Sequence, residues 1–391
     1  MVKRTVIVPL PPLDWGGLQT FAANIQAGLA SAGWSWTVIV PREANLIAER
    51  LQDAGIDVLQ RALPRFQRSP TATIAAILSL RASIRAIADT PQAQSADLVQ
   101  AVGAHHPHGY MLSQALDKPL VWQLHSNILP RLGRKLVAPF IAAKADAIMT
   151  NGKSVGRAFW PRGGESDHFV FYAPVDAHRF SPNLNERTRR RSDIGIADDE
   201  VLIGTVGNRG WQKNHELLVS AATDLCSRLS KIRFVVLGAT VASYEEKYRT
   251  GVLEVAEKIN SIRPGAVQFL SPGATINSWI HSFDVFVLTS HAEGVPIALF
   301  EAMAAGKPIV SSRVGSIGEI VNEGETGWTF PPLDKNALIQ RLEVLANDSE
   351  LRKEMGARGR QRLLTSFSID SVVSQHVAAY EHALRNRHVP Q

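Results

Sequence analysis

The chain has 391 residues, which at roughly 150 residues per domain predicts two domains, each large enough to bury a core of its own. Its composition, 45% hydrophobic and 20% charged, excludes a disordered or fibrous protein, and its single cysteine, Cys226, excludes an intrachain disulfide and a cysteine-cluster metal site. The net charge of +6 lies entirely in residues 1–180, which hold 18 Lys and Arg against 12 Asp and Glu; either this half meets an anionic partner or its solvated surface is unevenly charged.

Strands and helices alternate from the start of the chain. The first forty residues predict one βαβ unit, with a strand at Thr5–Val8, a glycine turn at Gly16 and Gly17, a helix over Leu18–Ala32 and a strand at Trp36–Val40. Helical patterns then separate further short β-branched runs, which favours a parallel sheet covered by helices on both faces. These further strands are predicted at Leu98–Val102, Leu120–Trp122, Ala147–Thr150 and Phe169–Phe171.

A second α/β unit follows a polar, charged stretch at residues 181–191, which fits a linker or the start of that unit. Two successive α/β units predict a cleft between them, where ligands of open parallel sheets usually bind. After Asp334 the pattern is helical nearly to the end. In the second unit we predict strands at Val201–Val206, Phe234–Leu237, Val267–Leu270, Val285–Leu288 and Ile309–Ser311, and helices at Asn214–Cys226, Glu245–Ile259, Ile276–His281 and Ile297–Ala305.

The sequence predicts a cytoplasmic location. Prolines Pro9, Pro11 and Pro12 cut the first apolar run short of a secretory core, and no apolar run reaches the roughly 18 residues that span a bilayer. Two basic stretches with apolar neighbours predict peripheral binding to anionic lipid on the inner face of the cytoplasmic membrane; the alternative is amphipathic helices packed on a sheet. The first stretch holds Arg131, Arg134 and Lys135 beside Leu132, Leu136 and Phe140, and the second holds Arg61, Arg65 and Arg68 near Leu63 and Phe66.

Two carboxylates eight residues apart, Glu293 and Glu301, belong to the most informative segment. Glu293 falls in a loop after a predicted strand, and Pro296 suits the first position of a helix. That helix is apolar on every face around Glu301, which predicts burial, and a buried carboxylate is costly without hydrogen-bond partners. The partner is either an internal Arg or Lys or the hydroxyl groups of a ligand. The glycine loop and the free amides at the helix start also suit a phosphate.

The spacing Glu-x7-Glu within residues 291–308 resembles the motif of the retaining glycosyltransferases of GT-B fold, family 4 of that classification (glycosyl transferases group 1). The turn at Gly16 and Gly17 resembles the family's N-terminal glycine loop, and residues 171–182 (FYAPVDAHRFSP) resemble its segment NGVDxxxFxP. Residues 314–328 resemble the stretch that follows the family motif. The resemblance extends over nearly the whole chain.

The resemblance implies a fold and its domains. The fold is GT-B, an α/β architecture of two Rossmann-like, doubly wound domains that face a central cleft. Residues 1–180 would form the N-terminal, acceptor-binding domain together with a returning C-terminal helix in residues 369–391. Residues 181–368 would form the C-terminal domain, which binds the sugar nucleotide.

The resemblance also implies roles for residues of the C-terminal domain. Glu301 would accept hydrogen bonds from ribose hydroxyls, and Glu293 would contact hydroxyls of the transferred sugar. Lys213 keeps the family's spacing after a glycine, whereas Arg209 stands one residue later than the family's arginine, with Asn208 in its place. In the family, cations at these positions stabilise the charge on a leaving nucleotide. The alternative for Lys213 and for Arg209 is a solvated surface charge without this role. The sugar nucleotide would also lie against the backbone of Gly16, Gly17, Gly294, Val295, Pro296, Ile297 and Ala298.

Histidines follow two predicted strands of the N-terminal half. His125 matches a family histidine that lies near the anomeric carbon; the alternative is a structural histidine. His105 and His106 follow an earlier strand and are further candidates. Together with His108 they could suggest a metal site, but they lack the spacing of helical ligands, and the family needs no divalent metal. We therefore predict no metal and no cofactor besides the donor substrate.

These features predict a retaining glycosyltransferase that moves a sugar from a UDP- or GDP-sugar to a glycan or lipid-linked acceptor, in polysaccharide, lipopolysaccharide or glycolipid biosynthesis of the bacterial type. No second carboxylate is placed for a double displacement, so we expect the family's front-face route, in which the leaving phosphate takes the acceptor proton. Two alternatives stay open: a sugar-nucleotide epimerase of GT-B-like fold, and a catalytically silent subunit that binds sugar nucleotide. Nucleic-acid binding is not expected, because the basic stretches carry no interleaved aromatic ladder.

Overall fold

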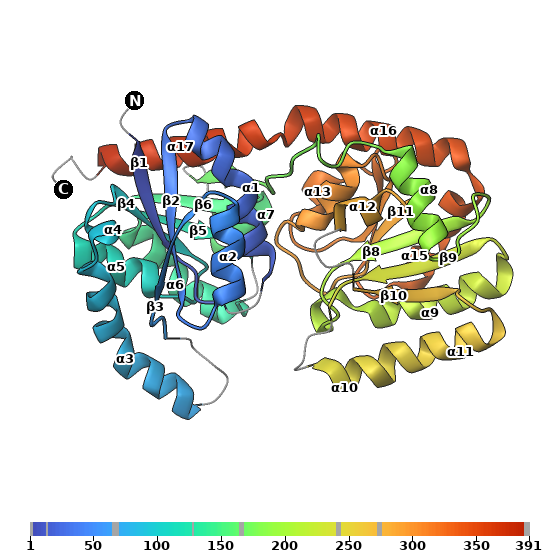
Figure 1. Cartoon of the computed structure of the whole chain (residues 1–391), viewed down its shortest axis with the longest axis horizontal. Helices are drawn as coiled ribbons and strands as arrows, with labels where there is room; N and C mark the ends of the chain where they lie inside the picture. The colour runs from blue at the N-terminus through green and yellow to red at the C-terminus, as the bar shows by residue number, and fades with distance from the viewer. Residues whose placement is uncertain are drawn as a thin grey trace. The chain divides into compact units, whose positions relative to one another are not determined.

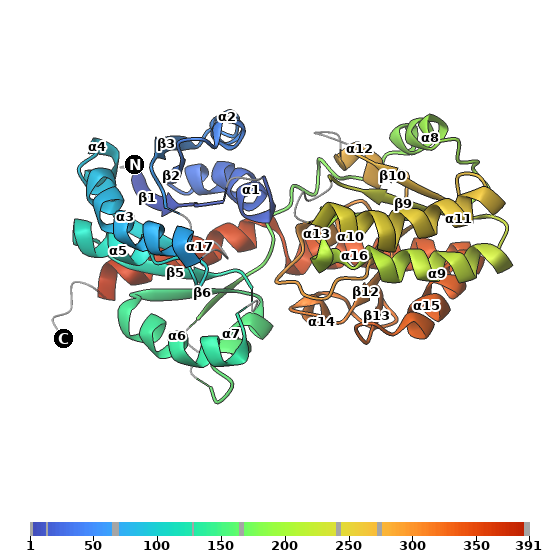
Figure 2. The ribbon, with the colours of Figure 1, turned by 90° about the horizontal axis from the view of Figure 1, so that it is seen from below.

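The computed structural model describes residues 3–12, 15–64, 70–126, 129–163, 168–239, 244–271 and 276–386. The chain forms two compact units, each built on a parallel sheet between helices (Figures 1 and 2). The first unit holds residues 1–174 and 369–391, and the second holds residues 175–368.

The first unit contains a seven-stranded sheet. Its elements are β1 (Arg4–Pro9), α1 (Gly17–Ser31), β2 (Trp34–Pro41), α2 (Asn45–Asp53), β3 (Asp57–Arg61), α3 (Pro70–Ala88), α4 (Pro91–Gln94), β4 (Leu98–Val102), α5 (His108–Leu116), β5 (Leu120–Leu124), α6 (Arg131–Lys144), β6 (Ala147–Asn151), α7 (Lys153–Phe159), β7 (Phe169–Phe171) and α17 (Ile369–Asn386). The strand order is β3-β2-β1-β4-β5-β6-β7, with Val99 of β4 opposite Leu120 of β5. Apolar side chains of α3, α5 and α6 form the core on one face of this sheet, and α17 packs beside α1 against β5, β6 and β7.

A chain of buried polar side chains joins this sheet to α17. Trp36 Nε1 donates to the hydroxyl of Tyr380 at 2.9 Å, and that hydroxyl donates to Gln100 Oε1 at 2.7 Å. Gln100 Nε2 donates to Gln123 Oε1 at 2.6 Å, and Gln123 Nε2 donates to His376 Nε2 at 3.0 Å. The other ring nitrogen of His376 bonds to a carbonyl of its own helix, so His376 is neutral. Each member satisfies the next, which fixes α17 on this unit.

The second unit contains a six-stranded sheet in the order β10-β9-β8-β11-β12-β13. Helices α9, α11 and α15 pack on one face, and α13 contacts α12 and α16 as well as β11 and β12. Its elements are α8 (Leu184–Asp193), β8 (Val201–Val206), the 3₁₀ turn η1 (Trp211–Lys213), α9 (His215–Arg228), β9 (Ile232–Leu237), α10 (Glu245–Tyr248), the π turn η3 (Arg249–Leu253), α11 (Glu254–Ile262), β10 (Val267–Leu270), α12 (Ile276–Ile280), β11 (Val285–Leu288), α13 (Ile297–Ala304), β12 (Ile309–Ser312), α14 (Ile317–Ile320), β13 (Gly327–Phe330), α15 (Lys335–Asn347) and α16 (Ser349–Ser366).

Every predicted strand is confirmed, and the described sheets contain two strands that were not predicted. The strands β3 and β13 are short, and each mixes polar or small residues with apolar ones, so neither gives a β-branched run. The helix predicted over Glu245–Ile259 is confirmed as continuously helical, and its middle part is the π turn η3, which separates α10 from α11. Gly251 lies in that turn, where a Cβ would approach Glu216 to 3.0 Å.

The boundary between the units lies at residues 174/175 instead of 180/181. The reason is that residues 175–180 pack with the second unit: Phe180 is buried, and Arg360 of α16 donates to the carbonyl of Ala177 at 3.1 Å. The polar stretch 181–191 lies near the start of the second unit and contains most of α8, where Arg191 is buried and pairs with Asp284 at 2.9 Å. Over the described ranges, no helix has both the length and the apolar character required to cross a membrane.

Candidate functional site

The candidate residues of the second unit gather where its central strands end. Lys213 lies in η1, after β8, and Glu293 lies in the loop after β11. These two strands are neighbours in the sheet, with Val285 opposite Ile203. Carboxyl ends of parallel strands share one edge of a sheet, and that edge is where ligands of such sheets bind.

Lys213 and Glu293 form an ion pair, with Nζ 2.7 Å from Oε1. The hydroxyl of Ser290 donates to the same oxygen at 2.7 Å. Glu293 is 6% exposed and Lys213 is 19% exposed, so the pair lies largely out of water and interacts more strongly than a surface pair. Gly207 makes room for the lysine, because a Cβ there would lie 2.7 Å from Lys213 Cε. The structure therefore brings together the two residues that the sequence assigned to diphosphate and sugar.

Residues 211–213 and 291–293 lie side by side and pair residue by residue. The ring of Trp211 stacks on that of His291, with centroids 4.7 Å apart. The amide of His291 donates to the carbonyl of Gln212 at 2.9 Å, and Gln212 Nε2 donates to the carbonyl of Ala292 at 2.8 Å. The ion pair is the third pair of this series. The sequence did not predict three residues that lie beside this ion pair, namely Trp211, His291 and Ser290. Only contacts in the folded structure link them to the pair.

Gly315 supports the loop that carries Glu293. Its φ is +55°, and a Cβ at this position would lie 2.0 Å from the carbonyl oxygen of Glu293. The amide of Ser316 donates to the carbonyl of Gly294 at 3.1 Å. The main chain of the loop is therefore held from the β12 side, which fixes the position of the Glu293 carboxylate.

Helix α13 begins at Ile297, as predicted, but Pro296 does not take the first helical position. Pro296 has an extended ψ of 118° and occupies the N-cap, so the first helical residue is Ile297 and not Pro296. Val295 is buried, and Gly294, Ile297 and Ala298 are partly exposed. Because a helix leaves its first amides without intrahelical acceptors, the amides of Ile297 and Ala298 are suited to an anion.

Glu301 lies within α13 and is 8% exposed. Burial raises its pKa to about 7, and the charge of Arg179 lowers it in part. Within the described part of the chain no Lys or Arg comes within 4 Å of this carboxylate and no donor bonds to it. The internal ion pair expected as one alternative is thus not found there. Arg179 was not predicted, because it stands at a variable position of the segment NGVDxxxFxP.

Arg209 is not part of the Lys213–Glu293 pair. Its guanidinium lies 5.4 Å above the ring of Phe269, and Nη2 donates to the carbonyl of Leu270 at 3.0 Å. Burial lowers its pKa. The pKa of His215 is lowered to about 3, first by burial and then by Lys213 and Arg209. The charges of Lys213 and Arg209 therefore disfavour the protonated form of His215, the first residue of α9. A contact between Arg209 and a diphosphate stays a prediction.

In the first unit, His125 follows β5 and sits between two aromatic rings. The centroids of Phe21 and Phe171 each lie 5.4 Å from that of His125, in edge-to-face geometry. Burial lowers the pKa of His125 to about 3, with a further contribution from His376. The imidazole is neutral at neutral pH, so it can exchange hydrogen bonds without bringing a charge.

The glycine loop leads into α1. Gly16 is the N-cap of that helix, and its amide donates to Gln19 Oε1 at 3.0 Å. Gly17 is the first helical residue, and a Cβ there would meet no described atom within 4 Å. Packing inside the described chain therefore does not require glycine at position 17, and a ligand contact there stays a prediction.

Three neighbouring histidines follow β4 in the first unit: His105 and His106 lie before α5, and His108 is its first residue. The rings of His105 and His106 are 4.0 Å apart, and His108 Nε2 bonds to the carbonyl of Pro64 at 2.7 Å. Burial lowers the pKa of His106 to about 3, with smaller effects of His105 and His108. No group of three side chains suited to hold a metal ion occurs among the residues with a described position.

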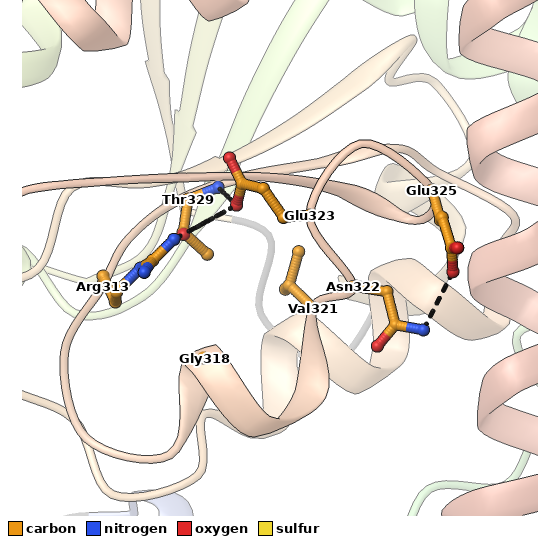
Figure 3. Close-up of a pocket in the computed structure, with 7 residues that line it drawn as sticks. All are labelled: Arg313, Gly318, Val321, Asn322, Glu323, Glu325 and Thr329. Carbon is orange, nitrogen blue, oxygen red and sulfur yellow. Dashed lines mark hydrogen bonds and ion pairs between the residues drawn. The ribbon is translucent and has the colours of Figure 1, made fainter.

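A hollow of about 440 Å³ lies between the end of β12 and the start of β13 (Figure 3). Its polar groups bond to one another. The amide and hydroxyl of Thr329 both donate to Glu323 Oε2 at 2.9 Å, and Arg313 Nε donates to the hydroxyl of Thr329 at 2.8 Å. Asn322 Nδ2 donates to Glu325 at 3.1 Å. The lining residues thus satisfy each other and do not point to a ligand.

Comparisons with known proteins identify the family of the chain. Residues 15–179 match the family model Glycosyltransferase Family 4, and residues 186–362 match Glycosyl transferases group 1. The sulfoquinovosyl transferase of Arabidopsis thaliana is 25% identical over 64% of this chain and 49% of its own length. The N-acetyl-alpha-D-glucosaminyl L-malate synthase of Bacillus anthracis is 25% identical over 51% of this chain and 50% of its own. The chain spans about half the length of these curated relatives.

Among solved structures, HepE of Anabaena in complex with UDP and glucose superimposes with a TM-score of 0.81 at 18% identity, over 97% of this chain and 99% of that one. This likeness shows the fold, two parallel-sheet α/β domains of the GT-B type, as the sequence predicted. With both family models matched, the chain belongs to the glycosyltransferases of group 1, family 4.

Proposed function

We propose that this chain transfers a sugar from a nucleoside diphosphate sugar to a glycan or lipid-linked acceptor, with retention at the anomeric carbon. The Lys213–Glu293 ion pair at the carboxyl ends of β8 and β11 carries the proposal. A diphosphate that reaches Lys213 takes the place of the carboxylate as its partner. Glu293 is then free to accept hydrogen bonds from hydroxyls of the sugar. Membership of the family supports this assignment.

Charge on the leaving nucleotide is met by groups of this chain. Lys213 supplies a cation, and the first amides of α13, at Ile297 and Ala298, supply donors at the positive end of the helix dipole. Arg209 is a second cation on the same edge of the sheet. Donors fixed in advance stabilise developing charge without reorganising, so we expect catalysis to rest on them and on positioning, with no metal ion or other cofactor.

The proposal also assigns a role to Glu301 of the second unit and, separately, to His125 of the first unit. Glu301 holds a carboxylate with no cation bound to it among the described residues, and ribose hydroxyls are donors that would meet it. His125 offers a neutral imidazole, which can bond to a hydroxyl near the anomeric carbon. The absence of a further carboxylate assigned to the reaction agrees with the front-face route, in which the leaving phosphate takes the acceptor proton.

The proposal is tested first by binding. Thermal unfolding is followed with UDP-, GDP- and ADP-sugars, and UDP-glucose is the first probe because HepE was solved with UDP and glucose. A donor that binds the folded state raises the unfolding temperature. The selected donor is then incubated with acceptor glycans and lipids, and the anomer of the product is read by NMR. Unchanged turnover in Glu293→Gln contradicts the assignment, epimerised donor points to the epimerase, and binding without any turnover points to a silent subunit.

We further propose peripheral binding to anionic lipid on the cytoplasmic face of the membrane, in polysaccharide, lipopolysaccharide or glycolipid biosynthesis. Helices α3, α5 and α6 contain no Asp or Glu. In α6, Leu132, Leu136 and Phe140 are exposed at successive i, i+4 positions beside the exposed Arg131 and Lys135. A basic, apolar helix face of this kind suits an anionic bilayer.

Two details change the prediction for this surface. Arg134 does not belong to the exposed face, because it bonds to the carbonyls of Leu129 and Ala158. Helix α3, which was not predicted to take part, exposes Ile74, Ile77 and Leu78. Of the second basic stretch, Arg65 and Arg68 lie outside the described residues, as does Phe66.

Vesicle flotation tests the membrane proposal. We expect the protein to float with phosphatidylglycerol vesicles and to remain in the lower fractions with phosphatidylcholine alone. The double change Leu136→Asp and Lys135→Glu should abolish flotation, whereas Lys353→Glu, at an exposed position of the second unit, should not. Flotation without any dependence on anionic lipid contradicts the proposal.

A further inference from the structure

Trp211 presents a large aromatic ring to solvent beside the Lys213–Glu293 ion pair. The residue is 59% exposed, although an indole ring gains free energy by leaving water. One face of its ring lies on His291, with ring planes 21° apart and centroids 4.7 Å apart. The stack holds the ring in one orientation and leaves much of its surface open.

The main chain under the ring is fixed as well. The amide of Asn214 donates to the carbonyl of Trp211 at 3.2 Å, which closes the 3₁₀ turn. The amide of His291 donates to the carbonyl of Gln212 at 2.9 Å, so the two stacked rings are carried by segments that bond to each other. A ring ordered before a ligand arrives loses little conformational entropy on binding it.

The position of the ring indicates the kind of ligand. Trp211 stands two residues before Lys213, and His291 stands two residues before Glu293, so the Cα atoms within each of these two pairs lie within about 7 Å of each other. A pyranose has apolar C–H groups on its faces and hydroxyls around its edge. The exposed ring fits such a face, and the Glu293 carboxylate fits the hydroxyls, as in sites where an apolar wall is joined by a few polar groups.

We propose that Trp211, backed by His291, is a stacking platform for a pyranose ring, either that of the donor sugar or that of the acceptor. The inference rests on the proposed transfer from a sugar nucleotide and adds a contact that recognises the sugar. It predicts that the platform does not contribute to binding of the nucleoside diphosphate itself, for which Lys213, Glu301 and the start of α13 are sufficient.

Calorimetric titration tests whether the pyranose that stacks on Trp211 belongs to the donor sugar. UDP and UDP-glucose, or the matched pair that the thermal screen selects, are titrated into the wild type, Trp211→Ala and Trp211→Phe. We expect Trp211→Ala to leave the affinity for the diphosphate unchanged and to weaken that for the sugar nucleotide roughly three- to tenfold. Trp211→Phe should keep most of the affinity. Ile262→Ala, which removes an 87% exposed side chain at the end of α11, is the matched control and should change neither.

Saturation-transfer NMR tests whether the pyranose that stacks on Trp211 belongs to the acceptor. Methyl glucopyranoside, methyl mannopyranoside and methyl N-acetylglucosaminide are added to protein saturated with the nucleoside diphosphate. A platform for the acceptor gives saturation transfer to ring protons in the wild type and loses it in Trp211→Ala. If Trp211→Ala matches the wild type in both experiments, the platform is overturned while the proposed function stands. If the wild type binds none of the sugar nucleotides, the proposed function fails and this inference fails with it.

Discussion

Lys213 and Glu293 stand 80 residues apart in the sequence and neutralise each other, with Nζ 2.7 Å from Oε1. Ser290 completes the set by donating to the same oxygen. Because both side chains lie largely out of water, removal of one leaves the charge of the other with few partners. The pair therefore contributes to the folded state of the second unit and, by the proposed function, separates when a diphosphate binds.

Replacement of the lysine should impair both binding and turnover. In Lys213→Ala we expect kcat to fall about 100-fold or more, the range found when one preorganised group that stabilises charge is removed. The unfolding free energy should fall by about 1–3 kcal/mol, because Glu293 keeps only Ser290 as a partner. Steady-state kinetics and urea unfolding measure the two effects.

The control for this change is Lys231→Ala. Lys231 is 66% exposed and pairs with Asp199 at 2.7 Å, on the same unit. An exposed pair contributes little, so kcat and stability should stay close to those of the wild type. Equal kinetic losses in the two variants would show that Lys213 has no special role.

Much of this site could be predicted from sequence because its parts are local. The spacing of Glu293 and Glu301 within one strand–loop–helix segment fixed the loop position of the first and the burial of the second. Lys213 was identified by its distance from Gly207, and a Cβ at this glycine would require the lysine side chain to shift, because it would lie 2.7 Å from Lys213 Cε. The strands of both sheets, except β3 and β13, followed from β-branched runs for the same local reason.

What could not be predicted depends on contacts between distant segments. Nothing local pairs Trp211 with His291, and the orientation of Arg209 toward Leu270 is set by the neighbouring strand. The unit boundary is likewise set by a distant residue, Arg360, which binds Ala177. Hydrophobic periodicity carries no information on such pairings, so these features required the structure.

Glu301 should give opposite changes in stability and in ligand affinity. The pKa of Glu301 in the folded state, about 7, exceeds the ordinary value of 4.5. The folded protein therefore binds the carboxyl proton of Glu301 more tightly than the unfolded chain does. The stability that the group contributes is therefore present below pH 4.5 and is lost as the pH rises through 7. At pH 8 Glu301→Gln should raise the unfolding free energy, by up to about 3 kcal/mol. The same change should weaken sugar-nucleotide binding.

The pH dependence of binding provides a second measurement on Glu301. Hydroxyl donors bond more strongly to the ionised carboxylate than to the protonated carboxyl group, so the affinity of the wild type should rise, by up to about tenfold, from pH 6 to pH 8, and this rise should vanish in Glu301→Gln. Glu257→Gln, at an exposed position of α11, is the control and should alter neither quantity. A lower stability of Glu301→Gln at pH 8 contradicts the ligand role and indicates a structural one.

The buried polar chain of the first unit predicts a strong effect of one hydroxyl. Tyr380→Phe leaves Trp36 Nε1 without an acceptor and Gln100 Oε1 without this donor, both fully out of water. We expect a loss of about 2–4 kcal/mol in unfolding free energy, measured by urea unfolding. Tyr110→Phe removes a hydroxyl from the same unit and should cost less than about 1 kcal/mol. Similar losses of unfolding free energy in Tyr380→Phe and Tyr110→Phe would argue against the view that the buried hydrogen-bonded series holds α17 on the first unit.

Gly315 offers a way to displace Glu293 without altering its chemistry. Its left-handed φ of +55° is unfavourable for alanine by about 1–2 kcal/mol, and the new Cβ would lie 2.0 Å from the carbonyl oxygen of Glu293. The loop must therefore move, and Gly315→Ala should lower kcat more than tenfold, because small displacements of positioning groups are costly.

A comparison with Gly318→Ala separates this displacement from a general effect of alanine near the site. Gly318 lies in α14, three residues further along, where the nearest neighbour of a new Cβ is Arg313 Cγ at an ordinary 3.7 Å. Helix propensity favours alanine there, so stability should stay equal or rise slightly and kcat should not change. If Gly315→Ala and Gly318→Ala both keep full activity, the loop that carries Glu293 tolerates displacement. The role of the Glu293 carboxylate would then not depend on the support that Gly315 gives to this loop.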